Sequence, residues 1–430
     1  MSLNALDGYE GADVGITPDD SPARDEYLQG TEVPVKQAQT IQIERENNGG
    51  NTIRQIELML RSKYIFRYNI VSDIVSFKLA SNPDAGFEDM TDYNYNSILR
   101  EIKLADIACS KDTLRTILKS DFVPRYDPYR EYIDSLPKWD GRTDYIAQLT
   151  ATIRTTNDEF FEFCLRKWIV AMIASWDSTE VVNHTALIFT GKQGIGKTLW
   201  FSHLIPKPLK RYIHSGRVNV RDKDSLVKLS ECPIVIMDEL ENMDGRNIDA
   251  LKELITKKDI YVRRAYAYAH ENYTRRASFA GSVNSKDFLV DVTGNRRFLC
   301  FEALNIDYQH RVDMDKVFSQ ALHLAKNGFQ FWFSADEIAA LEANNEEFRA
   351  VCSEEEQLTT FYEQCGRNDD NVLCMKTSDI AKSLCELSRL RSISEQKLGR
   401  VLHKLGFERF KHQGRYVYAL KLKRATQTTV

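Results

Sequence analysis

The chain has 430 residues, 43% of them hydrophobic and 28% charged, a composition typical of a globular protein with two to four domains. Its net charge of −4 excludes a chain that is basic throughout, so any contact with nucleic acid must come from a local basic surface. No stretch approaches the about 18 apolar residues of a membrane span, and the N-terminus lacks the features of a signal peptide. A cytoplasmic protein without membrane contact is therefore expected.

Residues 1–51 are predicted to be an acidic, flexible tail and linker. The first 33 residues carry many carboxylates against one arginine, Arg24, and the run Asn47-Asn48-Gly49-Gly50-Asn51 marks a break. Hydrophobic periodicity then predicts a small α/β domain over residues 52–121, with no pattern that indicates chemistry. Its helices are expected at 53–60, 93–102 and 111–118 and its strands at 64–69 and 74–77.

Residues 122–305 are predicted to form the largest domain, with a leading helical segment. Residues 160–173 are apolar on most faces and predict a core helix. Strands and helices alternate from 183 to 305, as a parallel sheet flanked by helices requires. A helical connector is expected over 306–354.

A glycine-rich motif, Gly191-Lys192-Gln193-Gly194-Ile195-Gly196-Lys197-Thr198, matches the phosphate-binding pattern G-x-x-x-x-G-K-[ST]. An apolar run precedes it and a helical pattern follows it, which is the context that such a loop requires. The motif predicts ATP and Mg²⁺ as ligands, with Lys197 at the β- and γ-phosphates and Thr198 on the metal. The residues expected to bind ATP are Gly191, Gln193, Gly194, Ile195, Gly196, Lys197 and Thr198.

Two polar strand ends follow the motif. A buried strand ends in Asp238 and Glu239, which predicts a metal ligand and a base for the attacking water, respectively. A second strand leads to Asn284, whose amide would orient the water or sense the γ-phosphate in an enzyme of the AAA+ type. Arg296 and Arg297 follow a Gly-Asn turn; they form either a surface ion pair or arginine fingers that act on the ATP of a neighbouring subunit. Fingers of this kind imply a ring.

Residues 261–276 alternate in character about a polar centre and predict a β-hairpin. Its interleaved aromatic and cationic residues suit single-stranded DNA, because bases stack on rings and phosphates pair with cations. A hairpin with merely solvated arginines is the alternative. The expected DNA contacts are Arg263, Arg264, Tyr268, His270 and Arg275.

The order of these motifs resembles the superfamily 3 helicase module, and within it the virulence-associated protein E family of phage and mobile-element replication proteins. The resemblance covers residues 120–302 and includes the upstream signatures Tyr126–Leu136 and Trp139-Asp140-Gly141. It implies an AAA+-like P-loop ATPase core, a hexameric ring and 3′-to-5′ travel on DNA. The first 120 residues lack the room and the carboxylate motifs of a primase domain, so a separate primase is expected.

Residues 355–430 resemble a winged helix. Helices are predicted at 377–384 and 394–406, followed by a hairpin about Gln413-Gly414. The second helix carries Lys397, Arg400 and Lys404, which are expected to contact duplex DNA, although a winged helix can also serve protein contact alone.

These patterns together predict an ATP-driven DNA helicase or translocase in the replication of a bacterial mobile element or prophage. One alternative is an AAA+ nucleotide switch in anti-phage defence that hydrolyses ATP without unwinding. Another is a winged-helix DNA-binding regulator with a degenerate ATPase, against which the intact Lys197, Asp238 and Glu239 argue.

Overall fold

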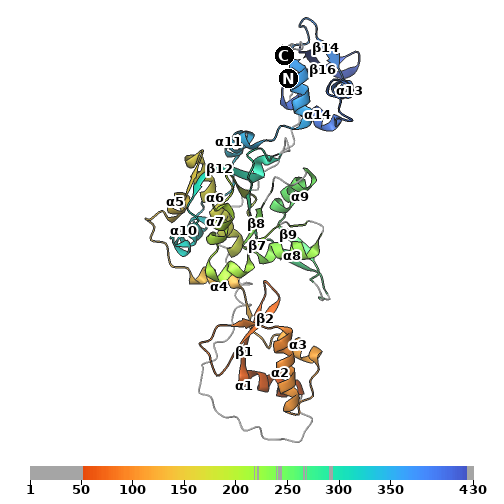
Figure 1. Ribbon diagram of the computed structural model, residues 1–430. Helices are drawn as coiled ribbons and strands as arrows, with labels where there is room; N and C mark the ends of the chain where they lie inside the picture. The colour runs from red at the N-terminus through yellow and green to blue at the C-terminus, as the bar shows by residue number, and fades with distance from the viewer. Residues whose placement is uncertain are drawn as a thin grey trace, which may run out of the picture. The chain divides into compact units, whose positions relative to one another are not determined.

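The structure is a computed structural model that describes residues 52–216, 218–219, 222–238, 240, 245–264, 267, 269–289 and 294–423, with the backbone alone at 245–246. The predicted tail, residues 1–51, lies outside the described residues. The chain divides into two compact units, one of residues 1–135 with 326–329 and one of residues 136–325 with 330–430. Each unit is described by itself below (Figure 1).

The first unit is a four-stranded sheet with helices, ordered β3-β2-β1-β4. β1 and β2 pair in antiparallel fashion over their whole lengths, which confirms the two predicted strands. The unit extends past residue 121 to Ser135, because β4 pairs in parallel with β1 and ties the following helix to this sheet. Its elements are α1 (Thr52–Lys63), β1 (Tyr64–Asn69), β2 (Ile74–Leu79), β3 (Glu88–Asp89), α2 (Asp92–Leu104), α3 (Lys111–Leu118), β4 (Arg125–Tyr126) and α4 (Pro128–Ser135).

The second unit is built on a six-stranded sheet of order β5-β12-β6-β11-β8-β7. All neighbouring pairs are parallel except β5 with β12, which confirms the predicted parallel sheet. The carboxyl ends of β6, β8, β11 and β12 therefore meet at one edge, where open α/β sheets bind their ligands. The strands are β5 (Ile153–Thr155), β6 (Ala186–Thr190), β7 (His214–Ser215), β8 (Ile234–Asp238), β11 (Ser278–Ser282) and β12 (Phe298–Ile306).

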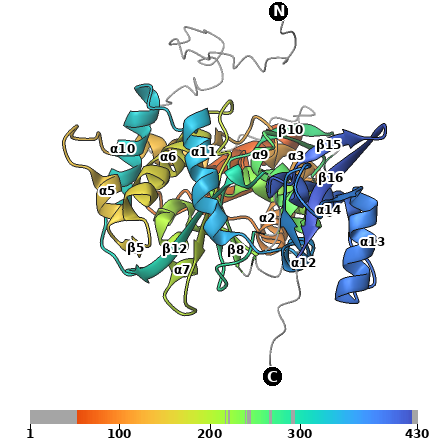
Figure 2. The same ribbon diagram turned by 90° about the horizontal axis from the view of Figure 1, so that it is seen from above.

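Helices pack around this sheet (Figure 2). Among those named here, α6 (Asp158–Asp177) is the most buried. Its N-cap is Asn157, whose side chain accepts a hydrogen bond from the main-chain N–H of Phe160, and the helix ends four residues beyond the predicted 160–173 core. No helix in the described part of the chain is long and apolar enough to cross a bilayer. The other helices are α5 (Tyr145–Thr150), α7 (Lys197–Leu204), η2 (Lys207–Tyr212), α8 (Lys223–Glu231) and α9 (Gly245–Thr256).

Most of the predicted connector, 306–354, packs into this unit, whereas residues 326–329 belong to the first unit. Gln320 on α10 (Met314–Lys326) accepts a hydrogen bond from the main-chain N–H of Ile146 at 3.0 Å. Asn345, the last residue of α11 (Ala335–Asn345), donates to the carbonyl oxygens of Asn295 and Phe298 at 2.9 and 2.8 Å. These buried amides hold α10 against α5 and α11 against the start of β12. A single turn, η5 (Glu346–Phe348), follows α11.

The C-terminal segment has its own apolar core, formed by α12, α13, α14 and a small sheet in which β13, β14 and β15 all pair with β16. The predicted hairpin is present, and its turn residues Gln413 and Gly414 both have positive φ, as a two-residue type I′ turn requires. The elements are α12 (Ser353–Phe361), β13 (Tyr362–Gln364), β14 (Leu373–Met375), α13 (Thr377–Ser388), α14 (Glu395–Lys404), β15 (Arg409–His412) and β16 (Arg415–Leu422).

Candidate functional site

The glycine-rich loop joins β6 to α7 at the carboxyl edge of the sheet. Gly191, Gly194 and Gly196 all have positive φ, between 84° and 132°. A Cβ atom at Gly191 would lie 2.5 Å from the carbonyl oxygen of Ala303, and one at Gly196 would lie 2.3 Å from Cδ1 of Tyr308. Both positions thus need glycine for backbone conformation and for space. Because α7 begins at Lys197, its first main-chain N–H groups point into the loop.

Lys197 lies folded into this loop and is only 6% exposed. Its Nζ donates to the carbonyl oxygens of Gly191 and Lys192 at 2.7 and 3.0 Å and to Oδ1 of Asn284 at 3.3 Å. Asn284 reaches the loop because β11, which it follows, pairs with β6. The structure therefore brings together the lysine and the amide that the sequence placed 87 residues apart. An ammonium group held by exchangeable oxygen acceptors is suited to an anionic ligand.

Three oxygen-bearing side chains meet beside the loop. Oδ1 of Asp238 accepts hydrogen bonds from Oγ1 of Thr198 at 2.7 Å and from Oγ of Ser282 at 2.8 Å. A carboxylate and a hydroxyl at this separation suit a Mg²⁺ ion that completes its shell with water and phosphate oxygens. Among the residues that the structure describes, no group of three or more His, Cys, Asp or Glu side chains could hold a metal alone. Sequence reasoning missed Ser282, although it ends the strand before Asn284.

Glu239, the predicted base, lies outside the described residues. Tyr308 was also missed by sequence reasoning, because no local pattern indicates that its ring packs on Gly196.

Arg296 and Arg297 lie at the amino-terminal ends of the parallel strands, whereas the loop lies at their carboxyl ends. They form the turn η4 (Asn295–Arg297), which leads directly into β12. β12 runs parallel to β6, with Phe298 opposite Ala186 and Glu302 opposite Thr190. The loop follows the carboxyl end of β6, so about five residues of strand, or about 16 Å, separate the arginines from it. Neither guanidinium forms an ion pair with an acidic side chain in the part of the chain that the structure describes.

The predicted hairpin is confirmed as β9 (Asp259–Val262) paired in antiparallel fashion with β10 (Glu271–Thr274). Arg263 and His270 are exposed, and His270 stacks on Tyr261 with ring centroids 5.4 Å apart. Tyr261 is 69% exposed, so the pair offers an aromatic surface to solvent. Sequence reasoning did not assign Tyr261 a role. Tyr268, which it did, lies outside the described residues.

The prediction that Arg275 contacts DNA is wrong. Its side chain is fully buried, because the chain turns at this residue from the hairpin into the central strand β11. Burial lowers the pKa of its guanidinium to about 9, so the group stays charged at neutral pH. The guanidinium donates to the main-chain carbonyls of Asn183, Ile255, Lys257 and Ala277.

Arg264 is also occupied within the fold. Its Nη1 lies 2.8 Å from Oε1 of Glu231 at the end of α8, and its guanidinium lies 4.8 Å from the centre of the Tyr273 ring. Both carboxylate and guanidinium are largely buried, so this pair fixes the hairpin to the helix. Arg264 is thus a structural residue here and is not presented to DNA.

In the C-terminal segment, Lys397 and Arg400 are exposed on α14, as expected. Lys404 differs, because its Nζ lies 3.0 Å from a carboxylate oxygen of Glu346 and its side chain is mostly covered. The hairpin beyond α14 adds exposed cations that the sequence analysis did not single out, among them Lys411 and Arg415.

The observations define a mixed α/β protein whose glycine loop and polar strand ends meet at the carboxyl edge of a parallel sheet. The family model of the virulence-associated protein E-like domain matches residues 133–350, just over half of the chain. The chain therefore belongs to the virulence-associated protein E-like family, which confirms the resemblance in its motifs.

Among solved structures, the chain is similar to the apo structure of the NrS-1 C-terminal region, with 13% identity and a TM-score of 0.44, over 87% of this chain and all of that one. It is also similar to SCCmec type IV Cch, described as an active helicase, with 10% identity and a TM-score of 0.34, over 83% of this chain and 92% of that one. No curated protein matches the chain.

Proposed function

We propose that this protein is an ATP hydrolase of the superfamily 3 helicase type, with an AAA+-like P-loop core, that moves DNA during the replication of a phage or mobile element. The observation that carries the proposal is the meeting of Lys197, Thr198, Asp238 and Asn284 at one point of the sheet edge. They come from the ends of three neighbouring strands, and each has the chemistry that a nucleoside triphosphate site needs at that place.

In this proposal the loop residues Gly191–Thr198 bind the phosphates of ATP through main-chain N–H groups. Lys197 exchanges its carbonyl partners for phosphate oxygens and opposes the charge of the transferring group. Thr198 and Asp238 hold Mg²⁺, which supplies charge compensation on the phosphates. Glu239 removes a proton from the attacking water, and Asn284 orients that water.

The distance between the two arginines and the glycine loop of the same chain supports arginine fingers that act in trans. Since Arg296 and Arg297 lie about 16 Å along the sheet from their own loop, a phosphate within their reach would be that of a second copy. Head-to-tail contacts of this kind form a ring when the rotation between successive copies closes. The proposed assembly is therefore a ring, with six subunits and 3′-to-5′ travel implied by the family resemblance.

DNA would be contacted at two surfaces. On the hairpin, Arg263 would pair with phosphates, and the Tyr261–His270 stack would receive a base of a single strand. In the C-terminal segment, proposed to be a winged helix, Lys397 and Arg400 would meet duplex phosphates. A separate primase remains an expected partner in this proposal.

Subunit mixing tests the proposal. Lys197→Ala and Arg297→Ala should each lower ATP turnover by about 100-fold or more, because each removes a charged group from the reacting phosphate. A mixture of the two variants should regain part of the activity, since some interfaces then hold one intact loop and one intact arginine. Arg296→Ala is tested in the same way, and Lys192→Ala, an exposed side chain of the same loop, is the control that should remain active.

Parent-level turnover by Lys197→Ala would disprove the site. Lack of rescue despite demonstrated subunit exchange would disprove the trans role. Strand displacement on forked DNA separates a helicase from a switch that hydrolyses ATP without unwinding.

A further inference from the structure

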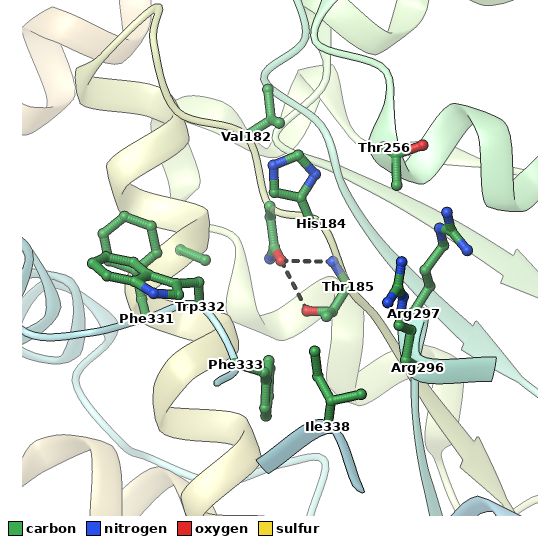
Figure 3. A pocket seen from close by; sticks show the side chains of 12 residues that line it. Val182, His184, Thr185, Thr256, Arg296, Arg297, Phe331, Trp332, Phe333 and Ile338 are labelled. Carbon is green, nitrogen blue, oxygen red and sulfur yellow. Dashed lines mark hydrogen bonds between the residues drawn. The ribbon is translucent and has the colours of Figure 1, made fainter. Parts of the chain in front are cut away.

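A pocket of about 300 Å³ lies at the arginine edge of the sheet, away from the loop. Its wall is formed on one side by aromatic side chains and on the other by the two arginines, with His184 and Thr185 between them (Figure 3). His184 and Thr185 directly precede β6, as Arg296 and Arg297 precede β12, so the parallel register of these strands places all four at the same edge.

The aromatic wall is held rigidly by a buried lysine. Nζ of Lys167, on α6, donates to the carbonyl oxygens of Gln330 and Trp332 at 2.8 and 2.9 Å and lies 3.1 Å from Glu337. The same ammonium lies 5.4 Å from the centre of the Phe333 ring. The main chain of residues 330–333 is therefore fixed by a charged anchor, yet the Trp332 side chain remains 56% exposed. An exposed tryptophan on a fixed main chain, next to arginines, is the composition of an interaction hot spot.

The charge of the pocket comes from its arginines. Burial and the nearby Arg275 and Arg297 lower the pKa of His184, so this imidazole is neutral at pH 7. A largely apolar wall whose charged groups are two guanidiniums suits a partner that brings apolar side chains next to an anion.

Two exposed leucines lie near the glycine loop, at the opposite ends of the strands from this pocket. Leu199 follows Thr198 on α7 and is 51% exposed, and Leu304 follows Ala303 on β12 and is 57% exposed. The strand register shifts between Ala303 and Asn305, so Leu304 stands at an irregularity of the kind that re-aims a side chain. Both leucines flank the glycine loop, since the carbonyl of Ala303 faces Gly191.

We propose that the pocket beside Arg296 and Arg297 is the socket for Leu199 and Leu304 of the next copy of this chain. The inference rests on the proposed head-to-tail ring, because only that contact brings the loop edge of one subunit to the arginine edge of its neighbour. With the two leucines bound in the socket, Arg296 and Arg297 would lie next to the phosphates of the ATP that the neighbouring copy binds. This ATP is the anion that the two guanidinium groups require. Trp332 and the pocket are then parts of the interface that completes the ATP site.

Cysteine cross-linking tests the socket in the full chain with a non-hydrolysable ATP analogue and single-stranded DNA. Ile338 lies in the pocket wall. The variants Leu304→Cys and Ile338→Cys are treated with a short bis-maleimide, first singly and then as a mixture. Neither variant alone should cross-link above the parent, which carries its own exposed Cys374. Their mixture should give a covalent dimer, and the double variant should give a ladder. Leu387→Cys, an exposed leucine of the C-terminal segment, replaces Leu304→Cys as the matched control and should give no dimer.

A second measurement does not depend on cysteine. Trp332→Ala should raise the protein concentration needed for assembly by about tenfold or more in sedimentation velocity, while ATP binding by the single subunit is unchanged. Rescue in the mixture of Lys197→Ala and Arg297→Ala without a Leu304–Ile338 dimer would overturn the socket and leave the ring. Failure to assemble at all would overturn both. A dimer from either single variant would show a two-fold contact and would also overturn the socket.

Discussion

Arg275 was predicted to contact DNA, but its side chain instead stabilises the fold. Its guanidinium is fully enclosed and satisfies four main-chain carbonyls from three separate segments. Arg275→Lys keeps the charge but cannot reach all four acceptors, and we expect it to lower the free energy of unfolding by about 3 kcal/mol. Urea denaturation measures this. Arg263→Ala, which changes an exposed arginine at the other end of the hairpin, should change stability by less than about 0.5 kcal/mol while weakening single-strand binding. Equal stability of the Arg275→Lys variant and the parent would contradict this role.

Gly196 is constrained by both backbone and space. Gly196→Ala places a side chain at φ 94°, which costs about 1–2 kcal/mol, and drives its Cβ into the ring of Tyr308. Gly194→Ala, at φ 84° with no atom within 4 Å of its Cβ, bears only the backbone cost. The first variant should therefore be the less stable in thermal unfolding without nucleotide. Tyr308→Ala should restore part of the loss in Gly196→Ala and none in Gly194→Ala. Full additivity of the two changes would show that the ring does not oppose the new methyl group.

At the scale of elements, some residues of the β9–β10 hairpin hold it to the rest of the fold, and others are exposed to solvent and available to a ligand. Arg264 fixes it to α8, and the exposed stack of Tyr261 and His270 remains for a ligand. Tyr261→Ala should weaken single-strand binding by about 1–3 kcal/mol, because one base loses its stacking surface. DNA-stimulated ATP turnover should fall with it, while basal turnover should not change. Tyr93→Ala, which removes an exposed tyrosine of the first unit, is the matched control in fluorescence anisotropy. An equal loss in both variants would contradict the assignment.

At the scale of the whole molecule, the C-terminal segment carries exposed cations on a chain whose net charge is negative, and we propose that these cations contact duplex DNA. Lys397→Glu combined with Arg400→Glu should weaken duplex binding and reduce the slope of log K against log salt by about two, because two DNA phosphates would no longer be neutralised. Lys382→Glu on α13 is the single-charge control. An unchanged salt slope would favour protein contact as the role of this segment.

The sequence by itself determined the local elements and the phosphate-site chemistry. The period of apolar residues predicted β1 and α3 within their observed bounds, because both depend on neighbours close in the chain. The rule that parallel strands end at one edge was enough to bring Lys197, Asp238 and Asn284 together before any contact was known. The motifs in residues 120–302 indicated the family, and the family model that matches residues 133–350 confirms it.

Only the tertiary structure decided which charged side chains face solvent and at which end of the parallel strands each functional turn lies. The burial of Arg275 depends on carbonyls up to 92 residues away, which no local period reports. The separation of Arg296 and Arg297 from the loop follows from the register of β12 with β6, and the packing of Tyr308 on Gly196 follows from the return of the chain beyond β12. Strand order and register are set by contacts distant in sequence, so the loop could be predicted from its residues and the pocket at the opposite edge could not.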